Sequence, residues 1–186
     1  MRDAQGRLAA AGFSPDPGVV EAVAGASLIA TATDDGVRRR MPAYARRAAC
    51  SLASLVGARV LLFDRSRESW TVIPPGRGPL DRAAVESLGT DYEYLLNQID
   101  EAAEDGVEVQ VWLTAEPPFQ GLDEVIRKHP DIDVVVAPDR PVKFSLGDRF
   151  RSLLHRRDVH AHIRKLVAPR PVLVAHEDGR ISLSPG

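Results

Sequence analysis

Carboxylate side chains directly follow two apolar runs in this chain. Asp34 follows the run 28–33, and Asp64 follows the run 59–63. Short runs that are nearly all apolar or β-branched are typical of buried strands in a parallel sheet. In such sheets ligands bind outside the carboxyl ends of the strands, where the winding direction reverses. This rule selects Asp34, Asp64 and the segment Ala137–Arg140 as candidate ligand-binding positions.

Magnesium-dependent phosphoryl transfer is one chemistry that strand-end carboxylates could support. A phosphoacceptor receiver domain needs an aspartate after the third strand and a lysine after the fifth, where this chain has Leu113-Thr114 and His176. The Asp-x-Asp pattern of strand-end phosphatases is absent, because Asp34 and Asp35 are adjacent. The sequence also lacks the G-x-S-x-G and P-loop motifs. We therefore expect no catalytic residues and no enzyme.

The elements that must position these residues alternate along the chain. Strands are expected at 28–33, 59–63, 107–113, 132–136 and 171–175, with helical spacing in the segments between them. This pattern predicts an α/β fold, a doubly wound five-stranded parallel sheet with helices on both faces. Alternation within 107–113 predicts an edge strand with one solvent-facing side. Asp178-Gly179 predicts a short C-terminal hairpin extension.

Composition limits the class of protein. The 186 residues carry a net charge of -2, so neither nucleic acid nor a membrane is an expected partner. A single cysteine and the lack of a signal-type apolar core in 1–16 indicate a cytoplasmic protein. Residues 1–26 are expected to form an N-terminal arm, loosely held over 1–17, and 27–186 a single domain.

The order of elements, together with one motif, resembles the universal stress protein family. The strand before Asp34, the segment Gly57–Leu62 and the ending Ala168-Pro169-Arg170-Pro171-Val172-Leu173-Val174 carry the resemblance, which covers about Ser27–Ala175. It implies strand order 3-2-1-4-5, a homodimer paired through the last strand, and a role in stress responses.

The family's ATP-binding signature, G-x-x-G-x9-G-[ST], is not retained after the fourth strand. Its first two glycines fall on Ala137 and Arg140, and its final Gly-Ser falls near Arg157-Asp158. Pro138 and Pro141 also remove two N–H donors that a phosphate cradle would use. The resemblance therefore predicts a binding or regulatory module, with a protein partner and no cofactor, that does not bind ATP in the family manner.

The alternative is an unconventional nucleotide or anion binder that accepts ATP or AMP. In it Asp34 would lie near the base and Arg140 near phosphate, with Asp64, Val136 and Ala137 completing the site.

Charge is segregated along the chain. Nine basic residues face three acids between Asp139 and Arg170, whereas Asp81–Asp133 has fourteen acids and three basic residues. The basic stretch is open to two interpretations, an anion or acidic-partner site and a solvated surface with ion pairs. His160 and His162 do not predict a metal site, because rings two residues apart on a helix point in different directions.

Overall fold

The computed structural model describes residues 2–31, 42–65, 79–114, 118–139 and 159–184. Of the residues proposed from sequence, Asp34 and Arg140 lie outside these ranges, as do Pro141 and Arg157-Asp158. The structure therefore tests the sheet, the helices and the strand ends.

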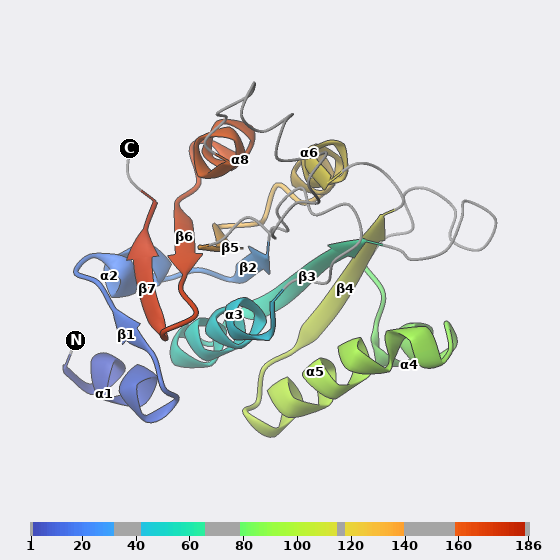
Figure 1. Cartoon of the computed structure of the whole chain (residues 1–186), viewed down its shortest axis with the longest axis horizontal. Coiled ribbons are helices and arrows are strands. Elements are labelled where there is room, and N and C mark those ends of the chain that lie inside the picture. The colour runs from blue at the N-terminus through green and yellow to red at the C-terminus, as the bar shows by residue number, and fades with distance from the viewer. Residues whose placement is uncertain (1, 32–41, 66–78, 115–117, 140–158, 185–186) are drawn as a thin grey trace, which may run out of the picture.

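One seven-stranded sheet forms the centre of the molecule (Figure 1). Its order is β1-β7-β6-β5-β2-β3-β4. The strands are β1 Ser14–Pro15, β2 Leu28–Thr31, β3 Arg59–Arg65, β4 Val109–Thr114, β5 Val134–Pro138, β6 Val172–Ala175 and β7 Arg180–Leu183. The five predicted strands, β2 to β6, pair in parallel in the predicted order, so the fold class is confirmed.

Helices cover both faces of the sheet (Figure 1). They are α1 Arg2–Ala10, α2 Val19–Val23, α3 Ala43–Val56, α4 Arg82–Glu86, α5 Glu93–Glu104, α6 Pro118–Lys128 and α8 Val159–Val167, with a 3-10 turn at Thr90–Tyr92. One core cluster holds the buried side chains of α1 to α5, and a second holds those of α6 and α8. Alternate residues of β2, β3 and β5 enter opposite clusters, as expected of a sheet buried on both sides.

The sequence explains where α3 begins and where it ends. Pro42 stands at the N-cap of α3, where a missing N–H is of no consequence, and Gly57 ends the helix with φ 72°. Its buried face packs on β2 and β5, the two strands between which the winding direction reverses. The start of α3 is thereby placed beside the carboxyl ends of these strands.

The edge position of the third predicted strand, β4, is confirmed, but its expected solvent-facing side is not found. Trp112 is 1% exposed because α6 covers that side of the sheet. The open edge of the strand is partly paired as well, since Leu80 and Val111 exchange two backbone hydrogen bonds of 2.7 and 2.9 Å. This pairing reduces the unpaired backbone that an edge strand exposes.

Residues 2–26 pack against the rest of the fold, in contrast to the loosely held arm expected over 1–17. Leu8 and Phe13 are buried in the larger core cluster. β1 pairs in parallel with β7, whose hairpin with β6 confirms the predicted extension. The contact requires glycine at the turn, because Gly179 has φ 87° and a Cβ there would collide with the carbonyl oxygen of Gly12.

Candidate functional site

The ends of β2 and β5 meet at the switch point of the sheet. Thr31, the last residue of β2, is fully buried, and its hydroxyl accepts a hydrogen bond of 2.9 Å from the Phe63 N–H. This bond joins the end of β2 to β3. Val136 and Ala137 are also fully buried, and they enter opposite core clusters. Their side chains support the strand end from within the core.

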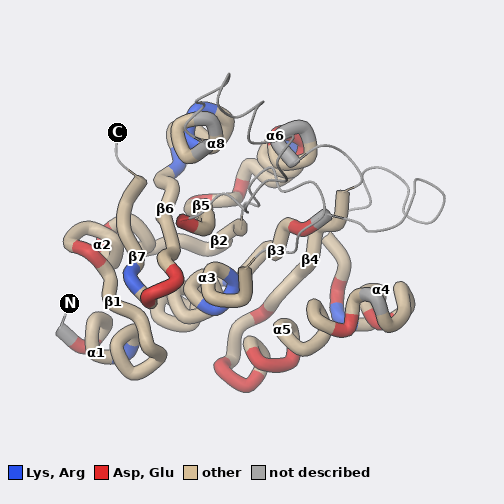
Figure 2. Tube along the Cα trace, viewed as in Figure 1, with Lys and Arg blue, Asp and Glu red and all other residues tan. Residues whose placement is uncertain are grey.

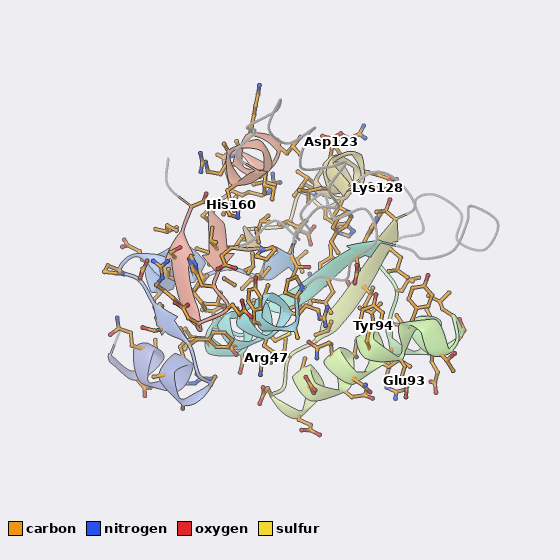
Figure 3. All side chains as sticks on the ribbon, viewed as in Figure 1. Arg47, Glu93, Tyr94, Asp123, Lys128 and His160 are labelled. Carbon is orange, nitrogen blue, oxygen red and sulfur yellow. The ribbon has the colours of Figure 1, made fainter. Side chains whose placement is uncertain are left out.

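Asp64 lies on the side of the sheet that α3 and α5 cover. Its side chain is 2% exposed and accepts a hydrogen bond of 2.9 Å from the Tyr94 hydroxyl. The Arg46 guanidinium stands 5.6 Å from the centre of the Tyr94 ring and donates to Gln98 at 3.3 Å. Figure 3 shows Tyr94 on α5, away from His160 on α8. Asp64 thus belongs to a buried polar contact that joins β3 to α5, which explains why a polar side chain is tolerated there.

Asp139 directly follows β5, and its carboxylate joins three separate parts of the fold. The Tyr44 hydroxyl, from the first turn of α3, donates to Oδ1 at 2.7 Å. The Nδ1 atom of His176, which follows β6, lies 3.3 Å from Oδ2. Nε2 of the same ring lies 2.9 Å from the Ser182 hydroxyl on β7. We refer to Tyr44, Asp139, His176 and Ser182 as the Asp139 cluster.

The Asp139 cluster is only partly open to solvent. The side chains of Asp139 and His176 are 16% and 17% exposed. Next to it, Nε2 of His160 lies 2.8 Å from the carbonyl oxygen of Pro138, which holds the start of α8 against the end of β5. The cluster therefore forms a polar, partly desolvated surface at the carboxyl ends of β5 and β6.

The order Ser182, His176, Asp139 has the connectivity of a nucleophile, a base and an orienting acid. In the tautomer with its proton on Nδ1, the imidazole would donate to Asp139 and accept from Ser182, although a guanidinium nitrogen of Arg180 also lies 3.4 Å from Nδ1. Acyl transfer also needs N–H donors directed at the developing oxyanion. Ser182 is paired with Val174 within the β6–β7 ladder, so its own N–H is used by the sheet. We therefore interpret Tyr44 and His176 as the groups that fix the position of the Asp139 carboxylate, with Ser182 supporting the imidazole.

Sequence reasoning placed a site in Ala137–Arg140 but did not single out Asp139. The strand-end rule that selected Asp34 and Asp64 applies equally to Asp139, which is the first residue after β5. Its partners Tyr44 and His176 are distant in sequence, and no local pattern connects them. The structure adds these two residues to the candidate site.

The described part of the basic stretch is used within the fold. Arg170 donates to the carbonyl oxygens of Ile132 at 2.6 Å and Pro130 at 3.1 Å. Arg164 donates to the Ser184 hydroxyl at 2.7 Å, which joins α8 to the C-terminal end of the sheet. The other basic residues of this stretch, apart from the exposed Lys165, lie at 140–157 outside the described ranges. Figure 2 shows the contrasting acidic residues along α5.

Neither a metal-ligand cluster nor a membrane-spanning helix is found in the described ranges. Over the described ranges, no three His, Cys, Asp or Glu side chains gather as a metal site. Likewise, none of the helices seen in those ranges has the length and apolarity needed to cross a membrane.

Comparisons with known proteins find similarity among solved structures alone. No family model and no curated protein matches the sequence. A universal stress protein in complex with cAMP has 15% identity and a TM-score of 0.47, covering 82% of this chain and 98% of its own. The universal stress protein from Archaeoglobus fulgidus in complex with dAMP has 16% identity and a TM-score of 0.44, and the match covers 80% of this chain and 96% of that protein. A protein of the universal stress protein family from Burkholderia pseudomallei has 18% identity and a TM-score of 0.39, and the match covers 85% of this chain and 98% of that protein.

Proposed function

We propose that this chain is a non-catalytic binding module whose ligand site lies at the carboxyl ends of β2 and β5, and that it does not bind ATP in the manner of universal stress proteins. One observation carries this proposal. The Asp139 carboxylate stands at the first position after β5, held at 2.7 Å by Tyr44 and 3.3 Å from His176. A carboxylate therefore lies within Ala137–Arg140, the stretch onto which the first two glycines of the family's ATP-binding signature fall.

The electrostatics of this strand end oppose phosphate. A carboxylate repels a phosphate group, and the repulsion is stronger where both are partly removed from water. Pro138 has no N–H to donate, in contrast to a glycine at a phosphate loop. A carboxylate accepts hydrogen bonds, so the preferred ligand carries donors such as ring amino groups, hydroxyls or an ammonium. We infer that the ligand is recognised by its donors.

A second candidate is an unconventional nucleotide or anion binder. In it Asp34 lies near the base and Arg140 near phosphate, whereas the buried residues Asp64, Val136 and Ala137 support the strand ends from within the core. The observation that favours it is the switch point between β2 and β5, because both Asp34 and Arg140 follow these strands closely in sequence. In this candidate the Arg140 guanidinium replaces the missing backbone donors.

A thermal-shift titration separates the two candidates. The ligands are adenosine, AMP, ATP, cAMP and dAMP, each with and without magnesium, because a ligand that binds the folded state raises Tm with the logarithm of its concentration. Recognition by donors predicts that adenosine shifts Tm at least as much as AMP and ATP, and that Asp139→Asn removes the shift. A shift that requires phosphate and is lost in Arg140→Ala establishes the second candidate. No shift with any of these compounds at millimolar concentration directs the search to protein partners.

We also propose that the protein is a cytoplasmic homodimer. β6 pairs with β5 on one side and with β7 on the other, so β6 itself presents no edge. β1 covers β7 only as far as Ile181, and beyond it Leu183 is 40% exposed. The end of β7 is therefore the part of the last strand that a second copy would use. Light scattering after gel filtration tests this, with a dimer expected for the native chain and a monomer for Leu183→Asp.

A further inference from the structure

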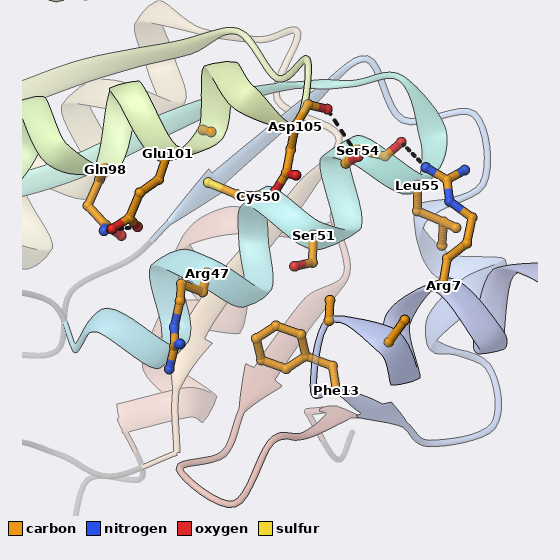
Figure 4. Close-up of a pocket in the computed structure, with 13 residues that line it drawn as sticks. Arg7, Phe13, Arg47, Cys50, Ser51, Ser54, Leu55, Gln98, Glu101 and Asp105 are labelled. Atoms are coloured by element: carbon orange, nitrogen blue, oxygen red, sulfur yellow. Dashed lines mark hydrogen bonds between the residues drawn. The ribbon is translucent and has the colours of Figure 1, made fainter.

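A cavity of about 560 Å³ lies between α1, α3 and α5, on the helical layer and apart from the strand ends (Figure 4). Its volume falls within the range of about 300–1,000 Å³ that small-molecule sites occupy. The residues that line it are Arg7, Ala10, Ala11, Phe13, Arg47, Cys50, Ser51, Ser54, Leu55, Gln98, Glu101, Ala102 and Asp105. Nothing in the proposed function uses these residues.

The geometry of α3 explains why the cavity faces its neighbours. Arg47, Cys50, Ser51 and Ser54 are at positions i, i+3, i+4 and i+7, so they share one face of the helix. Neither neighbouring helix fills the space above this face, which α1 borders on one side and α5 on the other (Figure 4). The result is an open hollow with a fixed helical floor.

The walls of the cavity carry charges of both signs. Arg7 and Arg47 contribute guanidinium groups from α1 and α3, while Glu101 and Asp105 contribute carboxylates from α5 and its C-cap. Figure 4 shows the two acids along the edge that α5 forms, with Arg47 near one end of the α3 face and Arg7 beside Ser54 near the other. Within the described part of the chain, none of these four side chains is in an ion pair.

Hydrogen bonds hold part of this charged rim in place. Nη2 of Arg7 donates to the carbonyl oxygen of Ser54 at 3.1 Å, and Gln98 donates to Oε2 of Glu101 at 2.7 Å. Both contacts leave other atoms of the charged group unused, since a guanidinium has five N–H donors and a carboxylate has two acceptor oxygens. The rim therefore offers guanidinium donors near both ends of the α3 face and carboxylate acceptors along α5.

Apolar side chains supply part of the lining, beside the hydroxyls of Ser51 and Ser54. Phe13 is 7% exposed, and Leu55, Ala102 and the alanines of α1 complete the apolar lining. Cys50 adds a neutral thiol, because burial, followed by the negative charge of Asp105, raises its pKa to about 12. A ligand that fits this lining has an apolar body between a negative and a positive end.

We propose that this cavity is a second binding site, which takes a small zwitterion with an apolar body, the class that includes apolar amino acids and dipeptides. The carboxylate of the ligand pairs with Arg47, and its ammonium pairs with Glu101 and Asp105. The apolar body lies on Phe13 and the floor of α3. A ligand with only one charged end satisfies half of the rim, so both ends contribute to affinity.

Isothermal titration calorimetry with leucine and leucyl-leucine tests the proposal on the full chain. We expect leucyl-leucine or leucine to bind, and N-acetylation or C-terminal amidation of the peptide to weaken binding by roughly tenfold or more, since each removes one charge-assisted contact. Arg47→Gln and Glu101→Gln are expected to weaken the native ligand by a similar factor. Glu104→Gln, an exposed neighbour on α5 outside the lining, is the matched control and leaves binding unchanged.

Three results overturn the proposal. The first is the absence of binding by either probe at millimolar concentration. The second is equal binding of the blocked and the free peptides, which rules out recognition of a zwitterion. The third is binding that is unaffected by both Arg47→Gln and Glu101→Gln, which places the ligand elsewhere. Circular dichroism of each variant separates a loss of binding from a loss of fold.

Discussion

The Asp133 carboxylate joins the start of β5 to the start of β2, so we expect its removal to destabilise the fold. Its Oδ2 accepts three hydrogen bonds, from the Ser27 N–H at 2.7 Å, the Ser27 hydroxyl at 2.9 Å and the Leu28 N–H at 3.2 Å. Burial raises the pKa of this carboxyl, but the bonds from Ser27 and Leu28 and the charge of Arg170 outweigh it, so the pKa lies below its ordinary value of 3.8.

The sign of the pH dependence follows from this lowered pKa. A carboxyl that holds its proton less tightly in the folded state stabilises that state above its unfolded pKa. The contribution is lost as pH falls from about 3.8 through the lower folded value. Hydrogen bonds to a charged acceptor contribute about 1.5–3 kcal/mol when buried. Because Asp133 is exposed, we expect about 1 kcal/mol, or a Tm shift of about 2–4 °C for a domain of this size.

Urea unfolding of Asp133→Asn between pH 7 and pH 3 measures this contribution. We expect the variant to be about 1 kcal/mol less stable than the native chain at pH 7, with the difference shrinking toward zero as the pH approaches 3. Asp131→Asn is the matched control, because Asp131 lies two residues away and makes only exposed contacts with Arg59 and His129 at 3.6 and 3.5 Å. A difference of the same size at pH 7 and pH 3 would show that folding does not lower the pKa of Asp133.

Three further predictions concern single residues. Gly121→Ala should lower the free energy of unfolding in urea by about 1–3 kcal/mol, because the new Cβ would lie 2.6 Å from Cγ2 of Thr114. Gly6→Ala is the control and should raise the free energy of unfolding by up to about 1 kcal/mol, because nothing lies within 4 Å of its Cβ. Equal effects of the two substitutions would contradict this prediction. Gly179→Ala should lower Tm and speed proteolysis of the N-terminal segment, since the new Cβ meets the main chain of Gly12; an unchanged Tm would show that the segment yields freely. Cys50, with its pKa raised to about 12, should react with a disulfide reagent at pH 8 at least about a hundredfold more slowly in the native chain than in urea; similar rates would show that the thiol is not buried.

The inner sheet was predictable because its strands are buried on both faces. A strand between two helical layers consists almost entirely of apolar and β-branched residues, and β2, β5 and β6 are fully buried. The same reasoning failed at residues 107–113, where Gln110 alternates with apolar residues. There α6 covers the side that carries Trp112, and Lys128 and His129 pack on its ring at 5.2 and 5.4 Å. Polar alternation indicated solvent, but helical side chains of mixed character occupy that space.

The N-terminal segment was misjudged because its partner is at the opposite end of the chain. β1 has two residues, and its local sequence is polar and rich in glycine and proline. Its pairing with β7 depends on a contact across most of the sequence, which no local periodicity encodes. The Asp139 cluster escaped prediction for the same reason. Its hydrogen bonds join residues that are 95 positions apart for Tyr44 and Asp139, and only the folded sheet brings them together.

The C-terminal hairpin connects the candidate site to the edge of the sheet. β7 covers the outer edge of β6, and the same strand supplies Ser182, whose hydroxyl lies 2.9 Å from the imidazole beside Asp139. A change at the edge, such as association of a second chain with the end of β7, would therefore act on a strand that holds His176. Because the imidazole contacts both Ser182 and Asp139, a shift of β7 would alter the support of the carboxylate at the strand end. If both proposals hold, ligand binding at this site and assembly through β7 would be linked through the His176 side chain, and by thermodynamic reciprocity each would change the affinity of the other.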